Sequence, residues 1–215
     1  MKNLVLITSI VAPPNNPFSY TNTRSVFTSD VRFEQTKNTI ECVKEKIPDV
    51  EIFVIECSQL TEVQKEYFET QCDYFLNLYN DPCIRNNVYG LSKSLGEYTL
   101  IINALEYIKN NKIVFDNFYK LSGRYWLSEN FNYSFFENND IVTCNGFTFL
   151  YKLNISNIES FYLFLISNQH LMVQCIGAEN LFAMFLQLPK NNNVIHIEKI
   201  GVKGYVAVSN DFINV

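Results

Sequence analysis

The chain has 215 residues, of which 47% are hydrophobic and 15% aromatic, and this is enough material for one domain with a well-filled core. It carries 17 basic and 22 acidic residues, a net charge of −5, and no lysine and arginine cluster that could follow a phosphate backbone. The composition therefore argues against a nucleic-acid partner. The six cysteines form no Cys-x-x-Cys pair, which argues against a metal knuckle and favours reduced thiols in a cytoplasmic protein.

Residues 4–11 form a short apolar run close to the N-terminus. A secretory signal contains such a run, and so does the buried first strand of an α/β sheet; the short length and the β-branched residues favour the strand. No later apolar stretch approaches the roughly 20 residues that span a bilayer. We therefore expect no membrane span and a cytoplasmic location.

Strand-like and helix-like patterns then alternate along the chain. Strands are expected at residues 4–11, 51–57, 74–78, 114–121, 140–144, 147–153, 194–200 and 205–208. A polar loop at residues 13–30 is followed by a helix that Pro48 ends. Thr61 and Gln64 form a capping box that begins a helix running to about Cys72, and Ser94 and Glu97 form one that begins the next helix. Two more helices are expected at residues 156–169 and 178–188. Asn145-Gly146 predicts a hairpin turn. The order indicates a single α/β domain whose sheet is parallel at first and mixed later.

Six segments follow one another in an informative order: Arg24-Ser-Val-Phe, Arg32-Phe-Glu-Gln-Thr, Leu91-Ser-Lys-Ser-Leu-Gly-Glu, Tyr119-Lys-Leu-Ser-Gly-Arg-Tyr, Gly177-Ala-Glu-Asn and Gly201-Val-Lys-Gly. Together they resemble small microbial and viral glycosyltransferases with the GT-A fold, and the Lys-x-Ser-Gly-Arg-Tyr element is the most specific of them. The resemblance spans nearly the whole chain. It implies a three-layer α/β/α, Rossmann-like mixed sheet in one domain, residues 1–215. Residues 1–121 would bind the nucleotide sugar, and residues 122–215 would carry the acceptor and catalytic functions.

The resemblance also implies the activity, that of a hexosyltransferase or related enzyme in glycan biosynthesis. A sugar would pass from a nucleotide diphosphate-sugar to a glycan or another hydroxyl acceptor. GT-A enzymes commonly hold a Mn or Mg ion with an Asp-x-Asp motif after a central strand. This chain has no Asp-x-Asp, and Ser122-Gly123-Arg124 stands in that place. The departure puts a divalent cation in doubt, and a guanidinium group could neutralise the diphosphate instead.

Residues near the ends of the predicted strands are the candidates for donor binding. They are Thr8, Ser9, Arg24, Arg32, Lys93, Ser94, Glu97, Ser122, Gly123 and Tyr125, with Arg124 assigned to both phosphate binding and catalysis. Arg24 and Arg32 are assigned to the long loop after the first strand, and Gly123 would let backbone approach the ligand closely. Each candidate also has a purely structural interpretation, such as a solvated arginine at a turn or helix capping by Ser94 and Glu97.

Glu179 is the candidate catalytic base, because it begins the helix at residues 178–188, where the dipole favours the ionised carboxylate. An acid at that position also simply stabilises a helix. His170 and His196, the only histidines, form no ligand pattern. Two alternatives to the glycosyltransferase stay open: a non-catalytic nucleotide- or glycan-binding module of the same fold, supported by the missing Asp-x-Asp, and a nucleotidyltransferase.

Overall fold

A seven-stranded sheet forms the centre of the protein in the computed structural model, which describes residues 1–191 and 193–215. The strand order is β3-β2-β1-β4-β7-β6-β8. In that order the strands span Tyr74–Asn77, Val50–Glu56, Asn3–Ser9, Asn117–Ser122, Leu150–Asn154, Ile141–Thr143 and Val194–His196. Strands β3, β2, β1 and β4 run parallel, whereas β7 is antiparallel to both β4 and β6. The predicted change from a parallel to a mixed sheet is confirmed.

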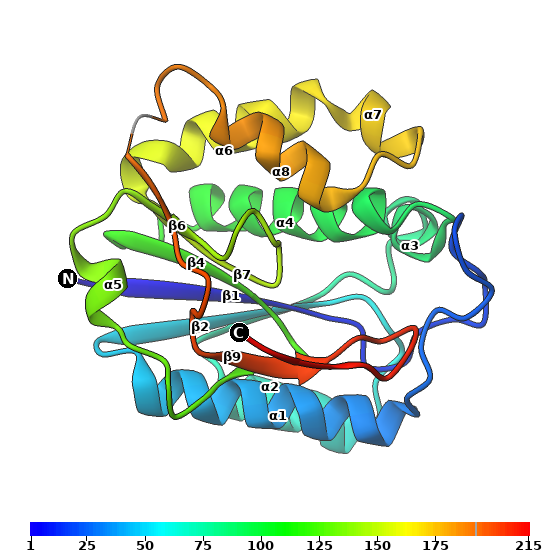
Figure 1. Cartoon of the computed structure of the whole chain (residues 1–215). Helices are drawn as coiled ribbons and strands as arrows, with labels where there is room; N and C mark the ends of the chain where they lie inside the picture. Colours follow the sequence, from blue (N-terminus) through cyan, green and yellow to red (C-terminus); the bar gives the residue numbers. More distant parts are fainter. Residues whose placement is uncertain (192) are drawn as a thin grey trace.

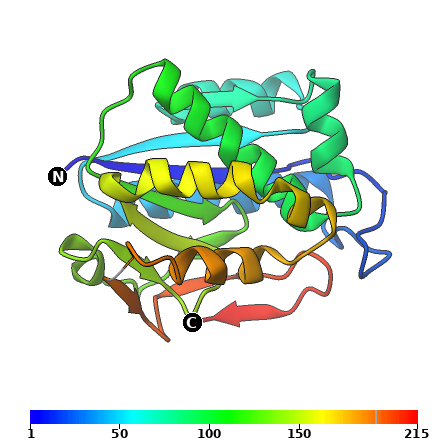
Figure 2. The ribbon, with the colours of Figure 1, turned by 90° about the horizontal axis from the view of Figure 1, so that it is seen from above.

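Helices cover both faces of this sheet (Figure 1). Helices α1 (Ser29–Lys46) and α2 (Glu62–Gln71) lie on one face. Helices α4 (Lys93–Asn110), α6 (Ile155–Ser167) and α8 (Ala178–Leu186) spread over the other (Figure 2). The short helices α3 (Pro82–Tyr89), α5 (Ser134–Glu137) and α7 (Gln169–Val173) lie in the connections. The expected three-layer α/β/α architecture is confirmed.

Strand β1 shows why its sequence is a continuous apolar run. Leu4 and Leu6 belong to the core cluster under α4, whereas Val5 and Ile7 belong to the cluster under α1. Successive side chains of a strand point to opposite faces, so a strand covered on both faces is apolar at every position. Residues 4–9 therefore form the buried strand that the sequence predicted, although it ends at Ser9 rather than Val11.

The helix starts confirm one predicted capping box and correct the other. In α2 the Thr61 side chain accepts from the Gln64 backbone, and the Gln64 side chain bonds back to Thr61. Helix α4 instead begins at Lys93 with Ser92 as its cap, because the Ser92 hydroxyl accepts from Leu95 N at 3.1 Å. The predicted Ser94 and Glu97 capping box is wrong, since Ser92 already satisfies the free amide. No helix in the described residues is both long and apolar enough to cross a bilayer.

The turn between β6 and β7 is the one predicted, with Asn145 at φ 49° and Gly146 at φ 81°. Phe147 N donates to Cys144 O at 2.8 Å and closes the turn. Two consecutive residues with positive φ form a type I′ turn, which Asn-Gly favours. The strand after it begins at Leu150 rather than at Phe147.

A small three-stranded sheet, with the order β10-β9-β5, lies beside α1 and was not predicted. Its strands are β5 (Tyr125–Leu127), β9 (Val202–Tyr205) and β10 (Phe212–Asn214). Gly204 allows β9 to lie against β5, because a Cβ there would sit 2.3 Å from Tyr125 Cδ1 and 2.7 Å from Arg124 O. This contact brings residues 206–208, predicted as strand, to the end of β4.

Candidate functional site

A cavity of about 140 Å³ opens where the parallel strands β1 and β4 end. The strand ends, the loop after β1, the first turns of α4 and residues 206–208 form its walls. Open α/β sheets bind ligands at this edge. Most of the predicted donor residues line the cavity: Thr8, Ser9, Arg24, Arg32, Lys93, Glu97, Ser122 and Arg124. Residues 206–208 were not anticipated, because only the small sheet carries them there.

Arg124 lines the cavity with a donor that the described part of the chain does not use. Its Nε is buried and has no hydrogen-bond partner among the described residues, and its guanidinium lies 5.2 Å from the Tyr125 ring centroid. A buried donor without a partner costs free energy that a ligand acceptor would recover. Arg124 therefore has the chemistry of an anion-binding group in its position at the end of β4.

Arg32 lies close to Arg124 and increases the local positive charge. Its Nε donates to Ile10 O at 2.6 Å. Burial, with a further contribution from the neighbouring Arg124, lowers the pKa of Arg32 to about 9. An anion between the two guanidinium groups would relieve this unfavourable pairing. Arg32 belongs to the first turn of α1, so its predicted place in the loop is wrong: α1 begins at Ser29, capped by the Thr28 side chain.

Arg24 does lie in the loop after β1, but protein atoms occupy its donors. Its guanidinium donates to the backbone oxygens of Asn16, Val88 and Tyr89, each at 3.0 Å, and lies 4.0 Å from the Phe18 ring centroid. These bonds tie the loop to the end of α3. Arg24 thus shapes the cavity wall, and direct contact with a donor stays a prediction.

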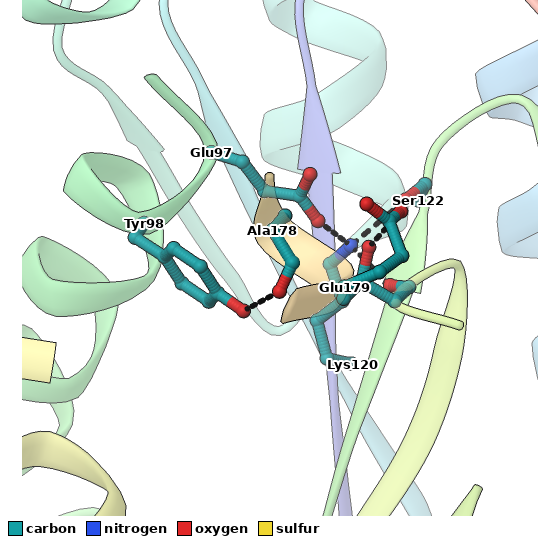
Figure 3. Close-up of polar contacts among 7 residues, drawn as sticks. Glu97, Tyr98, Lys120, Ser122, Ala178 and Glu179 are labelled. Atoms are coloured by element: carbon teal, nitrogen blue, oxygen red, sulfur yellow. Dashed lines mark hydrogen bonds and ion pairs between the residues drawn. The ribbon is translucent and has the colours of Figure 1, made fainter. Parts of the chain in front are cut away.

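A buried ion pair lies beneath the cavity. The fully buried Lys120 ammonium bonds the Glu97 carboxylate, Ser122 Oγ at 2.8 Å and Thr148 O at 2.6 Å (Figure 3). Burial raises the pKa of Glu97, but the positive charges of Lys120 and Lys93 lower it further, so the net shift is downward. Glu97 is therefore ionised. Because the charge of Lys120 neutralises that of Glu97, the positive charges of Arg32, Lys93 and Arg124 are not neutralised by a carboxylate of the described residues that line the cavity.

Sequence reasoning did not single out Lys120, although it is part of the Lys-x-Ser-Gly-Arg-Tyr element. The signal available was a lysine in the middle of an otherwise apolar strand, because lysine is almost never fully buried unless it is paired. The partner, Glu97, had been explained as a helix cap, which hid the pair.

Glu179 lies in the first turn of α8, beside this network. Thr148 Oγ1 donates to Glu179 Oε1 at 3.1 Å, and the backbone oxygen of the same Thr148 accepts from Lys120. Figure 3 shows Glu179 close to Ser122 and Lys120. The structure therefore brings Glu179 to the same end of the sheet as the cavity, on the side of α8.

The start of α4 holds the chain before α8 in place. Ser92 Oγ donates to Met172 O at 2.6 Å, Ser94 Oγ to Ile176 O at 2.5 Å, and Tyr98 Oη to Ala178 O at 2.8 Å. These bonds satisfy backbone oxygens around α7 and α8 and fix the direction in which Glu179 points. Ser94 makes one of these protein contacts and is not among the residues lining the cavity, and its contact with a donor stays a prediction.

Two further predicted residues support the site from outside the cavity. Gly123 N donates to Thr8 O at 2.9 Å, and a Cβ on Gly123 would lie 3.1 Å from Thr36 Oγ1 and 3.2 Å from Thr8 O. Gly123 thus allows a close approach of protein to protein, and its predicted approach to a ligand stays a prediction. The Tyr125 side chain is buried against Phe149, with ring centroids 5.4 Å apart.

By sequence, the chain matches no family model and no curated protein. By structure, it is similar to galactosyltransferase LgtC in complex with donor and acceptor sugar analogs, with a TM-score of 0.54 and 8% identity over 96% of this chain and 88% of that one. A protein assigned as a nucleotide-diphospho-sugar transferase from Desulfovibrio desulfuricans G20 gives 0.53 and 7%, over 92% and 80%. A glycosyltransferase involved in glycosylation of the major capsid of PBCV-1 gives 0.50 and 11%, over 92% and 82%.

The fold is GT-A-like. At this identity the similarity concerns architecture alone, so the chemistry must be argued from the residues of this chain. A divalent cation, which the fold family implies, prefers carboxylate oxygens. At the end of β4 the chain offers Ser122 and Arg124, with the Lys120 ammonium below them, and that ammonium engages the Glu97 carboxylate. This donor set does not fit a divalent cation.

Proposed function

We propose that the protein is a glycosyltransferase that moves a sugar from a nucleotide diphosphate-sugar to a hydroxyl group of a glycan. The observation that carries the proposal is the buried Arg124 Nε, which has no hydrogen-bond partner among the described residues and lies at a cation-rich cavity at the strand ends of a GT-A-like sheet. A diphosphate is the part of such a donor that needs several cations.

The cavity matches the diphosphate better than the whole donor. Its 140 Å³ is below the roughly 300 Å³ at which pockets for drug-sized ligands begin. In the proposal, Arg124, Arg32 and Lys93 contact the diphosphate oxygens, and the nucleoside and sugar extend through the mouth of the cavity. A guanidinium matches two phosphate oxygens at once, which favours Arg124 as the main contact.

The same cations would stabilise the leaving group. When the bond between the anomeric carbon and the phosphate oxygen breaks, the electron pair stays on the diphosphate, and negative charge grows there. Fixed positive charges at that point lower the barrier without reorganisation. In this proposal Arg124 and its neighbours do what a metal ion does elsewhere.

Glu179 is proposed as the acceptor base. Its carboxylate would take the proton of the acceptor hydroxyl as that oxygen forms its bond to the anomeric carbon. The Thr148 bond to one carboxylate oxygen orients the side chain and leaves the other oxygen for the acceptor. Glu179 lies beside the cavity and away from the cations proposed to bind the diphosphate, and this location supports its role as the base.

Arg124→Gln tests the donor site. We expect the dissociation constant for the best-bound member of a panel of uridine, guanosine, cytidine, adenosine and thymidine diphosphates to rise by about 10- to 100-fold, because a charge-assisted contact is lost. Calorimetric titration measures it. The control is Arg85→Gln, since Arg85 donates to Tyr79 O at 2.9 Å outside the cavity. Binding of none of the five nucleotides to the wild type would refute the proposal.

Chelation of divalent cations tests whether the nucleoside diphosphate binds without a metal ion. Because side-chain cations supply the positive charge, we expect the dissociation constant of that nucleoside diphosphate to be the same in EDTA and in excess manganese. The same titration in the two buffers measures it. Loss of binding in EDTA would show that an ion is required, contrary to the donor set at the end of β4.

The missing Asp-x-Asp also favours the second candidate, a non-catalytic binding module. Both candidates bind a nucleotide, so turnover separates them. Release of nucleoside diphosphate from the matching nucleotide sugar, with neutral oligosaccharides as acceptors, supports the transferase. Binding without donor hydrolysis or transfer supports the module.

A further inference from the structure

A cluster of aromatic side chains lies on the outer surface of the small sheet. The ring centroids of Trp126 and Tyr205 are 6.0 Å apart, those of Tyr205 and Phe212 5.2 Å, and those of Trp126 and Phe212 6.3 Å. Phe212 is 51% exposed, and Trp126 and Tyr205 are half-buried. Contiguous exposed apolar patches rimmed by polar residues mark interaction surfaces and ligand-binding grooves. We call these three residues the aromatic platform.

A shallow groove of about 460 Å³ separates the aromatic platform from α1, beside which β9 runs in Figure 1. Residues of α1 form its other wall: Asp30, Val31, Glu34, Gln35 and Asn38. The Oε1 atom of Gln35 is buried and has no hydrogen-bond partner among the described residues. Glu34 forms an ion pair with Lys37 at 2.9 Å. The lining of the groove is thus mostly apolar, with the rings of Trp126 and Tyr205 on one side and the exposed acids Asp30 and Glu34 on the other.

This combination selects a class of ligand. Ring faces carry negative potential and attract the C–H groups on the apolar face of a sugar ring. Carboxylate and amide oxygens accept hydrogen bonds from hydroxyl groups. The acidic side chains that line the groove, Asp30 and Glu34, disfavour phosphate or any other anion. A neutral carbohydrate satisfies all three conditions.

We propose that the aromatic platform and the groove bind a neutral glycan at a second site, separate from the diphosphate cavity. Tyr205 lines the groove and the next residue, Val206, lines the cavity, so the two sites share one segment of chain. A glycan held here would stay close to the place of transfer. The choice of a glycan over another neutral ligand rests on the proposed function.

Trp126 makes the proposal directly measurable because it is the only tryptophan of the chain. Its fluorescence emission is expected to shift and saturate when neutral hexasaccharides of glucose, mannose, galactose or N-acetylglucosamine are titrated into the full-length protein. Saturation with at least one of them supports the site. No change with any of the four overturns it. Saturation with tetramethylammonium alone overturns it as well, because the site would then be an aromatic cage for cations.

Variants locate the binding and separate it from the donor site. Phe212→Ala is expected to weaken hexasaccharide binding about fivefold, through the loss of one stacking surface, with nucleoside diphosphate binding unchanged. Phe135→Ala is the matched control, since Phe135 is 43% exposed on α5, outside the groove. Equal affinities in Phe212→Ala and Phe135→Ala would overturn the assignment. Arg124→Gln should keep hexasaccharide binding, so a failure of the donor site is distinguishable from a failure of the aromatic platform.

Discussion

Replacing Glu179 with glutamine is expected to lower kcat for sugar transfer by about 10²- to 10⁴-fold, the usual contribution of a positioned general base. The amide keeps the shape of the side chain and can still accept from Thr148 Oγ1, but it cannot take a proton. Donor affinity should not change, because the cations proposed for the diphosphate line the cavity, whereas Glu179 lies beside it. The measurement is nucleoside diphosphate release under saturating donor and acceptor, together with calorimetric donor binding.

Glu159→Gln is the matched control, because Glu159 is an exposed acid on α6. It should leave kcat as in the wild type. If Glu179→Gln retains full kcat, the base assignment is wrong. The ionised Glu97 would be the next carboxylate to test, since it lines the cavity.

Replacing Lys120 with methionine is expected to lower the free energy of unfolding by about 3 kcal/mol or more, because Glu97 would be left as an unpaired buried charge. Lys120 is fully buried, and the Glu97 side chain is 13% exposed. Urea denaturation followed by Trp126 fluorescence measures the loss. The second substitution Glu97→Gln in the same chain should restore part of the stability, because it removes the orphaned charge.

An ion pair on the surface provides the control. Lys65 and Glu69 are 3.6 Å apart, and both side chains are 52% exposed. Exposed pairs contribute little, so Lys65→Met should cost less than about 1 kcal/mol. Equal losses of unfolding free energy in Lys65→Met and Lys120→Met would show that burial does not increase the contribution of the Lys120 pair to stability. A double variant no more stable than Lys120→Met would show that the charge of Glu97 is not the cause.

The two predictions are connected through Thr148. Its hydroxyl orients Glu179, and its backbone oxygen accepts from Lys120. The buried pair therefore holds the chain that positions the proposed base, in addition to stabilising the sheet. A network whose donors and acceptors are satisfied in this way keeps one conformation, which a catalytic geometry requires.

Much of the fold could be predicted because its signals are local. The apolar run of β1, the Thr61 and Gln64 capping box and the Asn145-Gly146 turn each depend on residues a few positions apart. The parallel order of the first strands follows from their alternation with helices. The position of the cavity follows too, since ligands of open sheets bind where parallel strands end. Most candidate donor residues therefore line one cavity.

The sequence by itself thus determined the layered α/β fold and the edge of the sheet that carries the candidate site. Only the tertiary structure decided which side chains meet there. Glu97 and Lys120 are 23 residues apart, and Ser94 reaches Ile176 across 82. Such contacts depend on how a helix lies over a strand. A local sequence pattern carries no information about how a helix lies over a strand. Glu97 therefore matched a capping box, although its charge is paired with a buried lysine.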